Sequence, residues 1–204
     1  AGDTYCSKTF IDGKWYWMVI NGYFGESISE WSEIWTFTVD TIEPARPDLL
    51  KLIDNTRTNQ THPTFEWVPN EESVLQFQFQ LDIQDTFNLP LINETSIENP
   101  YYSCLIPLDE GLYYWRVRTM DLASNWGNWS EIESFVVDTT APSSPELVSP
   151  LDEELLISNV PILVWDPVSD GVQYQIQLDN TSTFTAHPTI YTTNRTHIRI
   201  PIQL

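Results

Sequence analysis

The sequence predicts an all-β chain built from tandem seven-stranded antiparallel β-sandwiches. One observation is a repeat without gaps: the segment that begins at Gly111 has a second copy that begins at Gly13, 98 residues earlier. A fixed period of this size is typical of a tandem array of one module. The other observation is the alternation of apolar and polar residues in several segments, whereas helical periodicity extends over no useful length.

The two copies of the segment match at glycine, aromatic, aspartate and proline positions. The matched pairs are Gly13 and Gly111, Trp17 and Trp115, Trp31 and Trp129, Phe37 and Phe135, Asp40 and Asp138, and Pro44 and Pro142. The period therefore divides the 204 residues into the C-terminal strands of a first module (1–40), one complete module (41–140) and the N-terminal strands of a third (141–204).

The first of these parts is expected to hold the last three strands of its module. A tight turn at Asp12-Gly13 leads into a strand over 14–20, in which Trp15, Trp17 and Val19 share one face. The next strand covers 31–40.

Two proline-bearing segments, 40–47 and 138–145, repeat each other. Proline removes a backbone donor and stiffens the chain. We interpret these segments as the boundaries between modules.

The complete module is expected to contain seven strands. They lie near 48–53, 63–68, 74–83, 89–93 and 101–107, followed by the two strands of the segment that begins at Gly111. The strand over 74–83 is the clearest, because five apolar residues alternate with four polar ones and so indicate one buried and one wet face. The apolar set is Leu75, Phe77, Phe79, Leu81 and Ile83, and the polar set is Gln76, Gln78, Gln80 and Asp82.

The third part repeats the same plan. Trp165 follows Trp67 by 98 residues, and a one-residue deletion then shifts Gln177–Asp179 to 97 residues behind Gln80–Asp82. The alternation continues through Val172, Tyr174, Ile176 and Leu178.

Seven short strands in each 98 residues, a tryptophan in the second strand (Trp67, Trp165) and an aromatic-rich sixth strand resemble the fibronectin type III-like, or Ig-like, β-sandwich over the whole chain. The sequences GLYYWRVR at Gly111 and FVVDTTAP at Phe135 resemble repeated modules of large bacterial and archaeal surface proteins. The resemblance implies a hydrogen-bonded tyrosine corner, made by either Tyr113 or Tyr114.

The segment Trp126–Ser130 resembles the Trp-Ser-x-Trp-Ser box of cytokine-receptor fibronectin domains, where tryptophans interleave with arginines. Arg116 and Arg118 share one face of the preceding strand. The resemblance implies a ladder in which guanidinium groups lie over indoles. We interpret the ladder, made of Arg116, Arg118, Trp126 and Trp129, as a structural clamp between the last two strands. The first module has Met18 and Ile20 at the arginine positions, so the ladder is optional there.

The composition is strongly acidic, with 9 Lys plus Arg, 29 Asp plus Glu and a formal net charge of −20. Such a surface repels phosphate backbones and anionic lipid. Nucleic acid and simple membrane adsorption are therefore not expected, and the sequence contains no 20-residue apolar span.

Cys6 and Cys104 lie 98 residues apart and so occupy the same position in successive modules. Ile198 takes that position in the third module if Pro107 is aligned with Pro201. A cysteine that exchanges with isoleucine is most simply a small buried residue, and no disulfide within a module is expected.

Neither catalytic residues nor a cofactor site are predicted. The three histidines, His62, His187 and His197, lie without metal-ligand spacing, and phosphate-binding glycine loops and nucleophile motifs are absent from the sequence. Asp40 and Asp138 lie at the module boundaries with acidic neighbours such as Glu43 or Asp121, a setting in which a calcium ion could bind. An aspartate that ends a strand in a turn is the favoured interpretation.

The sequence holds five N-glycosylation sequons, each expected in a loop or at a strand edge. Their asparagines are Asn59, Asn93, Asn128, Asn180 and Asn194.

Repetition without a reactive site predicts a non-enzymatic structural or adhesive protein outside the cell or at its surface, a rod or fibre whose partners are further copies of the repeat. Residues 1–40 supply strands that 141–204 lack. Strands could therefore be exchanged between copies, or these residues could be one segment of a longer array of repeats. The alternative function is a carbohydrate-binding accessory module of a secreted enzyme, with sugars stacked on Trp35, Tyr23 and Trp126.

Overall fold

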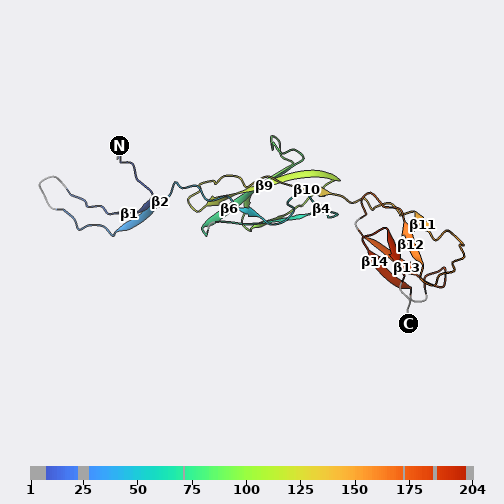
Figure 1. The fold of residues 1–204 in the computed structure, drawn as a ribbon. Coiled ribbons are helices and arrows are strands. Elements are labelled where there is room, and N and C mark those ends of the chain that lie inside the picture. The colour runs from blue at the N-terminus through green and yellow to red at the C-terminus, as the bar shows by residue number, and fades with distance from the viewer. Residues whose placement is uncertain (1–7, 23–27, 71, 172, 186–187, 201–204) are drawn as a thin grey trace. The chain divides into compact units, whose positions relative to one another are not determined.

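The computed structural model describes residues 8–22, 28–70, 72–171, 173–185 and 188–200. Its regular elements are strands, and the described residues contain no helix, which confirms the all-β prediction (Figure 1). The chain divides into two compact units, Ala1–Thr139 and Thr140–Leu204.

The first unit begins with a hairpin of β1 (Gly13–Trp17) and β2 (Trp35–Val39). Trp17 lies opposite Trp35, and their ring centroids are 5.7 Å apart. Trp15 packs edge-on against Phe10 at 5.0 Å. Most of the apolar side chains of the hairpin remain exposed, Trp17 by 48%.

The complete sandwich consists of two sheets. The first has the order β3 (Asp48–Leu49), β5 (Thr64–Val68) and β8 (Tyr101–Ser103). The second has the order β4 (Thr56–Thr58), β10 (Glu133–Val137), β9 (Gly111–Asp121), β6 (Val74–Asp82) and β7 (Ile92–Ile97).

The first strand of the module differs from the prediction, because it splits into β3 and β4 and changes sheet. Leu52, Asp54 and Asn55 have positive φ angles of 58°, 52° and 58°, which turn the chain between the two parts. β4 then pairs with β10 in parallel, whereas every other strand pair is antiparallel. The module therefore has eight strands rather than seven.

The core lies between the two sheets and is mostly aromatic. Phe65 is fully buried and contacts Trp115 at 5.0 Å and Phe135 at 5.4 Å between ring centroids. Trp67 packs against Phe77 at 5.4 Å. The inward residues of β6 and β9 thus meet the inward residues of β5, as their alternation predicts.

The prediction that the polar face of β6 is exposed to solvent is wrong. Gln78, Gln80 and Asp82 are each 7–8% exposed, and the amides of Gln78 and Gln80 are hydrogen-bonded to Arg118 and Arg116 of β9. The apolar set is also shorter than predicted, since Leu75 is 44% and Ile83 62% exposed.

The tyrosine corner is made by Tyr113, whose hydroxyl donates to the carbonyl of Asp109 at 3.0 Å. Burial raises the pKa of this phenol. Cys104 is a free thiol that is 3% exposed and donates to the carbonyl of Ile106. Cys6 lies outside the described residues.

The second unit repeats part of the sandwich. One sheet has the order β11 (Leu147–Ser149), β12 (Ile162–Trp165) and β15 (His197–Arg199), and the other pairs β13 (Tyr174–Leu178) with β14 (Thr189–Thr193). Trp165 contacts Tyr174 at 5.4 Å, the same ring distance as in the equivalent pair Trp67 and Phe77.

The alignment of Ile198 with Cys104 is wrong. The amide of Cys104 donates to Pro63, and the amide of Ile200 makes the same bond to Pro161. Ile200 therefore takes the cysteine position, and the exchange of cysteine for isoleucine still holds.

Two core tryptophans differ in their indole N–H groups, which gives a stability test. Trp115 Nε1 donates to the carbonyl of Leu52 at 2.8 Å, whereas Trp67 Nε1 is buried without a partner. Phenylalanine at position 115 leaves a carbonyl unpaired, while at position 67 it removes an unsatisfied donor. We expect Trp115→Phe to lower the free energy of unfolding by about 1–2 kcal/mol more than Trp67→Phe in urea titrations. Equal losses would show that the indole hydrogen bond contributes nothing.

Candidate functional site

The predicted arginines and tryptophans come together in one stack on the outer face of β9. The Arg118 guanidinium carbon lies 4.6 Å from the Trp126 ring centroid and 4.7 Å from that of Trp129. Arg116 lies 4.3 Å from Trp129 on one side and 4.3 Å from Phe87 on the other. Five side chains therefore alternate as ring, cation, ring, cation, ring.

Phe87 was not expected in the ladder. It lies between β6 and β7 with a φ of 50° and is 6% exposed. Nothing in its sequence neighbourhood marks this role, since only the pairing of β6 with β9 places it beside Arg116.

Amide side chains of the neighbouring strands orient both guanidinium groups. Gln80 Oε1 accepts from Arg116 Nε at 2.9 Å and Nη2 at 2.7 Å, and Gln78 Oε1 accepts from Arg118 Nε at 2.8 Å. Both glutamines donate in turn to Asn93 Oδ1, at 2.8 and 3.2 Å. The alternating glutamines of β6 are the sequence signal that could have revealed this layer, because they face the alternating arginines of β9.

The ladder cations are held by rings and amides. In the part of the chain that the structure describes, neither Arg116 nor Arg118 takes part in an ion pair. Burial lowers the pKa of both guanidinium groups, and for Arg116 the adjacent charge of Arg118 lowers it further. An arginine remains charged under such shifts, so the stack contains two neighbouring cations in an acidic protein.

Hydrogen bonds to Asp121 hold the loop that carries Trp126 and Trp129. Asp121 Oδ1 accepts from the amides of Ala123 at 2.8 Å and Asn125 at 2.9 Å, and Oδ2 accepts from Asn125 Nδ2 at 3.0 Å. Burial raises the pKa of Asp121, but these hydrogen bonds outweigh burial and hold the pKa below its ordinary value.

A serine clip fastens the loop to β9. Ser130 donates its amide to the Val117 carbonyl at 2.8 Å, and its hydroxyl accepts from the Val117 amide at 3.1 Å. Ser32 makes both bonds to Val19 in the first module, each at 2.9 Å. The clip thus repeats, whereas the first module has Met18 and an exposed Trp31 in place of the ladder.

We call the two proline-bearing segments, 40–47 and 138–145, the joints. Near the start of each joint a threonine donates hydrogen bonds to a carboxylate of the preceding strands. Asp12 Oδ1 accepts from the Thr41 amide at 3.1 Å and from its hydroxyl at 3.0 Å. Glu110 Oε1 accepts from the Thr139 amide at 2.9 Å and from its hydroxyl at 2.6 Å. Glu110 follows Asp12 by 98 residues, and Thr139 follows Thr41 by 98 residues. This carboxylate–threonine clamp is therefore the second structural feature that repeats, after the serine clip.

The first joint also docks on the ladder loop. Asn125 Nδ2 donates to the carbonyls of Asp40 at 3.0 Å and Ile42 at 3.4 Å. Pro44 is buried against Gly127, where a Cβ atom would lie 2.3 Å from the Pro44 carbonyl oxygen. A glycine is required there because the two backbones approach so closely.

The five sequon asparagines are all exposed. Asn128 lies in the ladder loop, Asn59, Asn180 and Asn194 lie outside strands, and Asn93 lies on the edge strand β7, where its Oδ1 accepts from two glutamines. Among the described residues no group of three His, Cys, Asp or Glu could hold a metal ion.

Asp40 Oδ1 accepts from the Ile42 amide, and Asp138 pairs with Arg57 at 2.8 Å. His62 Nδ1 lies 3.1 Å from the Thr61 hydroxyl, His197 is exposed in β15, and His187 lies outside the described residues.

No family model matches the chain, and no curated protein matches its sequence. Similar solved structures include an α-L-rhamnosidase from Dictyoglumus thermophilum, with 13% identity and a TM-score of 0.39 over 52% of this chain and 15% of that chain. A β-1,2-glucanase from Parabacteroides distasonis has 16% identity and a TM-score of 0.36 over 59% and 17%. The chain thus spans about a sixth of the length of these glycosidases.

The FN1–FN3 domains of chicken CNTN1 have 12% identity and a TM-score of 0.41 over 92% of this chain and 66% of that chain. These likenesses assign the chain to no family.

The first module suggests a direct test of the ladder. Arg116→Met and Arg118→Ile give the complete module the residues that the first module has at these positions. Each change removes two ring contacts and strands a glutamine acceptor, so we expect each to lower the free energy of unfolding by about 1–2 kcal/mol. Lys51→Met, which removes an exposed ion pair with Glu66, is the matched control and should cost under about 1 kcal/mol. Losses equal to the control would show that the stack does not stabilise the fold.

Asp121 predicts a specific pH dependence. Its folded-state pKa is depressed, so its contribution is present above the unfolded-state pKa of about 3.9 and is lost as pH falls through the folded-state value. We therefore expect the stability gap between the parent and Asp121→Asn to close as pH falls from 6 to about 2. Urea titrations at several pH values measure the gap, and a gap that stays constant would contradict the assignment.

Proposed function

We propose that the chain is a non-enzymatic structural or adhesive array of β-sandwich modules that works outside the cell, at the cell surface, with further copies of the repeat as its partners. The observation that carries the proposal is the carboxylate–threonine clamp, which is built at both joints with the same spacing. A protein whose repeated features are its core and its joints is suited to holding modules at fixed intervals.

The docking of the first joint supports the same function. Asn125, Gly127 and the buried Pro44 tie the segment between modules to the sandwich that follows it. Arg46 adds an exposed ion pair to Glu131 at 2.5 Å. Such contacts limit motion at a linker that proline already stiffens.

The extracellular assignment in this proposal includes glycans on the exposed sequon asparagines. Asn59, Asn128, Asn180 and Asn194 are the preferred acceptors. At Asn93 a glycan competes with the bonds from Gln78 and Gln80. The described residues include no helix that is long and apolar enough to span a membrane.

A carbohydrate-binding role as an accessory module of a secreted enzyme is the second candidate, and the 62% exposure of Trp35 favours it. Trp126 is less suited to sugar stacking, because Arg118 covers one face of its ring. Tyr23 lies outside the described residues. Glycan binding that is lost on Trp35→Ala and kept on Tyr16→Ala would favour this second function.

Gly127→Ala tests the proposed function at the joint. The added methyl group cannot coexist with the Pro44 carbonyl, so the joint must lift from the sandwich. We expect amide hydrogen exchange over residues 40–46 to accelerate at least about tenfold, while exchange within β5 and β6 stays unchanged. Leu122→Ala, an exposed change in the same loop, is the control. Rapid exchange of the joint in the parent chain would contradict a role as a fixed spacer.

A further inference from the structure

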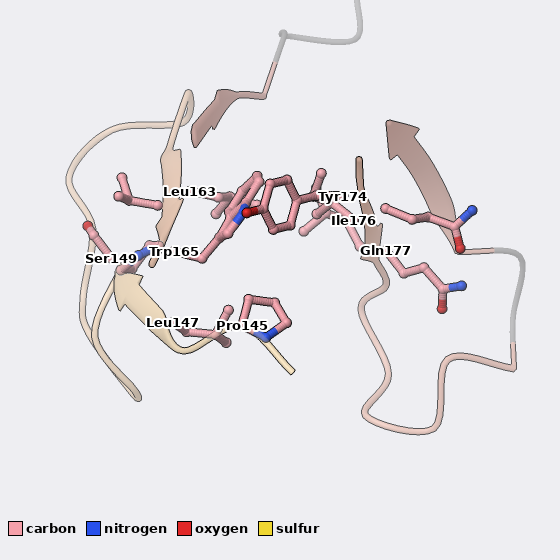
Figure 2. A pocket seen from close by; sticks show the side chains of 12 residues that line it. Pro145, Leu147, Ser149, Leu163, Trp165, Tyr174, Ile176 and Gln177 are labelled. Atoms are coloured by element: carbon pink, nitrogen blue, oxygen red, sulfur yellow. The ribbon is translucent and has the colours of Figure 1, made fainter. Parts of the chain in front are cut away.

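Two hollows of the molecule differ in the chemistry of their walls. In the second unit a cavity of about 350 Å³ lies between β12 and β13, and its lining is mostly apolar, with Leu163, Trp165 and Ile176 among its residues (Figure 2). A hollow of about 660 Å³ at the first joint, which we call the joint hollow, combines an aromatic ring with charged and amide side chains. Mixed walls of this kind suit a sugar, which has both hydroxyl groups and apolar C–H surface.

The joint hollow lies between two points at which the joint touches the complete sandwich. At the first point Pro44 is buried against Gly127, where the two backbones approach closely. At the second point Arg46 pairs with Glu131. The chain leaves the surface of the sandwich only between these contacts, so both ends of the joint hollow are set by the fold.

An acceptor asparagine stands in the wall of the joint hollow. Asn128 and Trp129 line it from the ladder loop, and residues 43–46 line it from the joint. Asn128 is exposed and begins the sequon Asn128-Trp129-Ser130. Its neighbour Gly127 makes the contact with Pro44, so the attachment point of a sugar lies one residue from the joint.

The walls offer the groups that bind a sugar. Glu43 supplies carboxylate acceptors for hydroxyl groups, and Arg46 has more N–H donors than its ion pair uses. Trp129 supplies apolar surface, and it offers its edge because Arg116 and Arg118 both lie over its ring. The joint hollow therefore has acceptors, donors and an apolar edge within reach of Asn128.

We propose that a sugar N-linked to Asn128 binds in the joint hollow and connects the ladder loop to the first joint. The inference rests on the proposed function, because it gives one of the glycans of an extracellular array a role at the joint. The bond forms between Asn128 Nδ2, which loses a proton, and C1 of the sugar. The bond from C1 to a lipid-linked phosphate donor breaks, and the phosphate leaves with its electron pair.

The sugar acts between the two existing contacts of the joint. It touches both walls at once, so opening the joint requires the loss of its contacts as well as those of Pro44 and Arg46. The glycan is then a structural part of the spacer. Asn59, Asn93, Asn180 and Asn194 do not line the joint hollow, so their glycans lack this effect.

Hydrogen exchange of the full chain tests the contact. The parent is made in a host that N-glycosylates secreted proteins, because Ser130 of the sequon is 6% exposed and must be reached before the loop closes on β9. It is compared with Asn128→Gln from the same host. We expect residues 40–46 to exchange at least about threefold more slowly in the parent. Equal exchange in the two chains would overturn the proposal.

Two controls assign the effect to the sugar on this residue. Asn59→Gln removes a sequon away from the joint hollow and should exchange like the glycosylated parent. Without glycosylation, in a host that lacks it, the parent and Asn128→Gln should exchange alike over 40–46. A faster joint in the unglycosylated variant would assign the contact to the asparagine itself, against the proposal.

Trimming separates the first sugar from the rest of the glycan. An endoglycosidase that cleaves between the first two sugars leaves one N-acetylglucosamine on each modified asparagine. The trimmed parent should keep the slow exchange over 40–46, because the first sugar is the one beside both walls. A return to the rate of the unglycosylated chain would place the contact in the outer sugars and overturn the assignment.

Nuclear Overhauser effects locate the sugar directly. In the trimmed parent, protons of the sugar on Asn128 should show effects to Trp129 and to at least one of residues 43–46. The sugar on Asn59 is the control and should show no effects to these residues. A sugar on Asn128 whose effects reach no residue of the joint would contradict the proposal.

Three outcomes separate this inference from the function on which it rests. Slow exchange over 40–46 that is the same with and without the glycan overturns binding in the joint hollow and leaves the spacer standing. Rapid exchange in the unglycosylated chain that the glycan slows supports binding in the joint hollow, but contradicts a spacer fixed by protein contacts alone. A chain that carries glycans at its other sequons and none at Asn128 overturns the inference and leaves the array standing.

Discussion

Strand β9 is buried on its inner face and half-buried on its outer face, and this constraint organises the complete sandwich. Its inner residues, Tyr113, Trp115 and Val117, enter the aromatic core, while its outer arginines enter the ladder. The inner face is stabilised by apolar burial and the outer face by ring, amide and backbone contacts. One strand therefore fixes the position of the core, of the loop that carries Trp126 and Trp129, and, through Asn125, of the joint.

The outer face shows how an acidic protein accommodates two half-buried cations. A carboxylate partner beside each guanidinium would have to be desolvated as well, whereas an aromatic face and an amide oxygen are neutral and pay less to leave water. Gln78 and Gln80 supply the oxygens, and Asn93 orients both of them. The ladder thus holds two neighbouring cations with aromatic rings and amide oxygens, both of them neutral groups.

The repeat separates what the array depends on from what one module adds. The serine clip and the carboxylate–threonine clamp both occur twice, at positions 98 residues apart. The clip uses the same atoms in both places, whereas the carboxylate of the clamp is an aspartate in one and a glutamate in the other. The ladder occurs only in the complete module, within the described residues. Loop attachment and joint geometry are therefore shared, and the ladder is an extra stabilisation of one copy. In the β1–β2 hairpin and in the second unit, residues at the repeat positions of the sandwich core remain partly exposed.

Alternation and the 98-residue period by themselves determined most of the strands and of the inward core residues, because both patterns report which side chains share a face. The four predicted members of the ladder came from the resemblance to the Trp-Ser-x-Trp-Ser box. The two patterns could not show what covers a face. The burial of Gln78 and Gln80, the place of Phe87, the choice of Tyr113 over Tyr114 and the sheet change at Leu52 were decided by the tertiary structure. The burial of the glutamines and the place of Phe87 depend on contacts between segments that lie far apart in the chain, which alternation within one strand does not report.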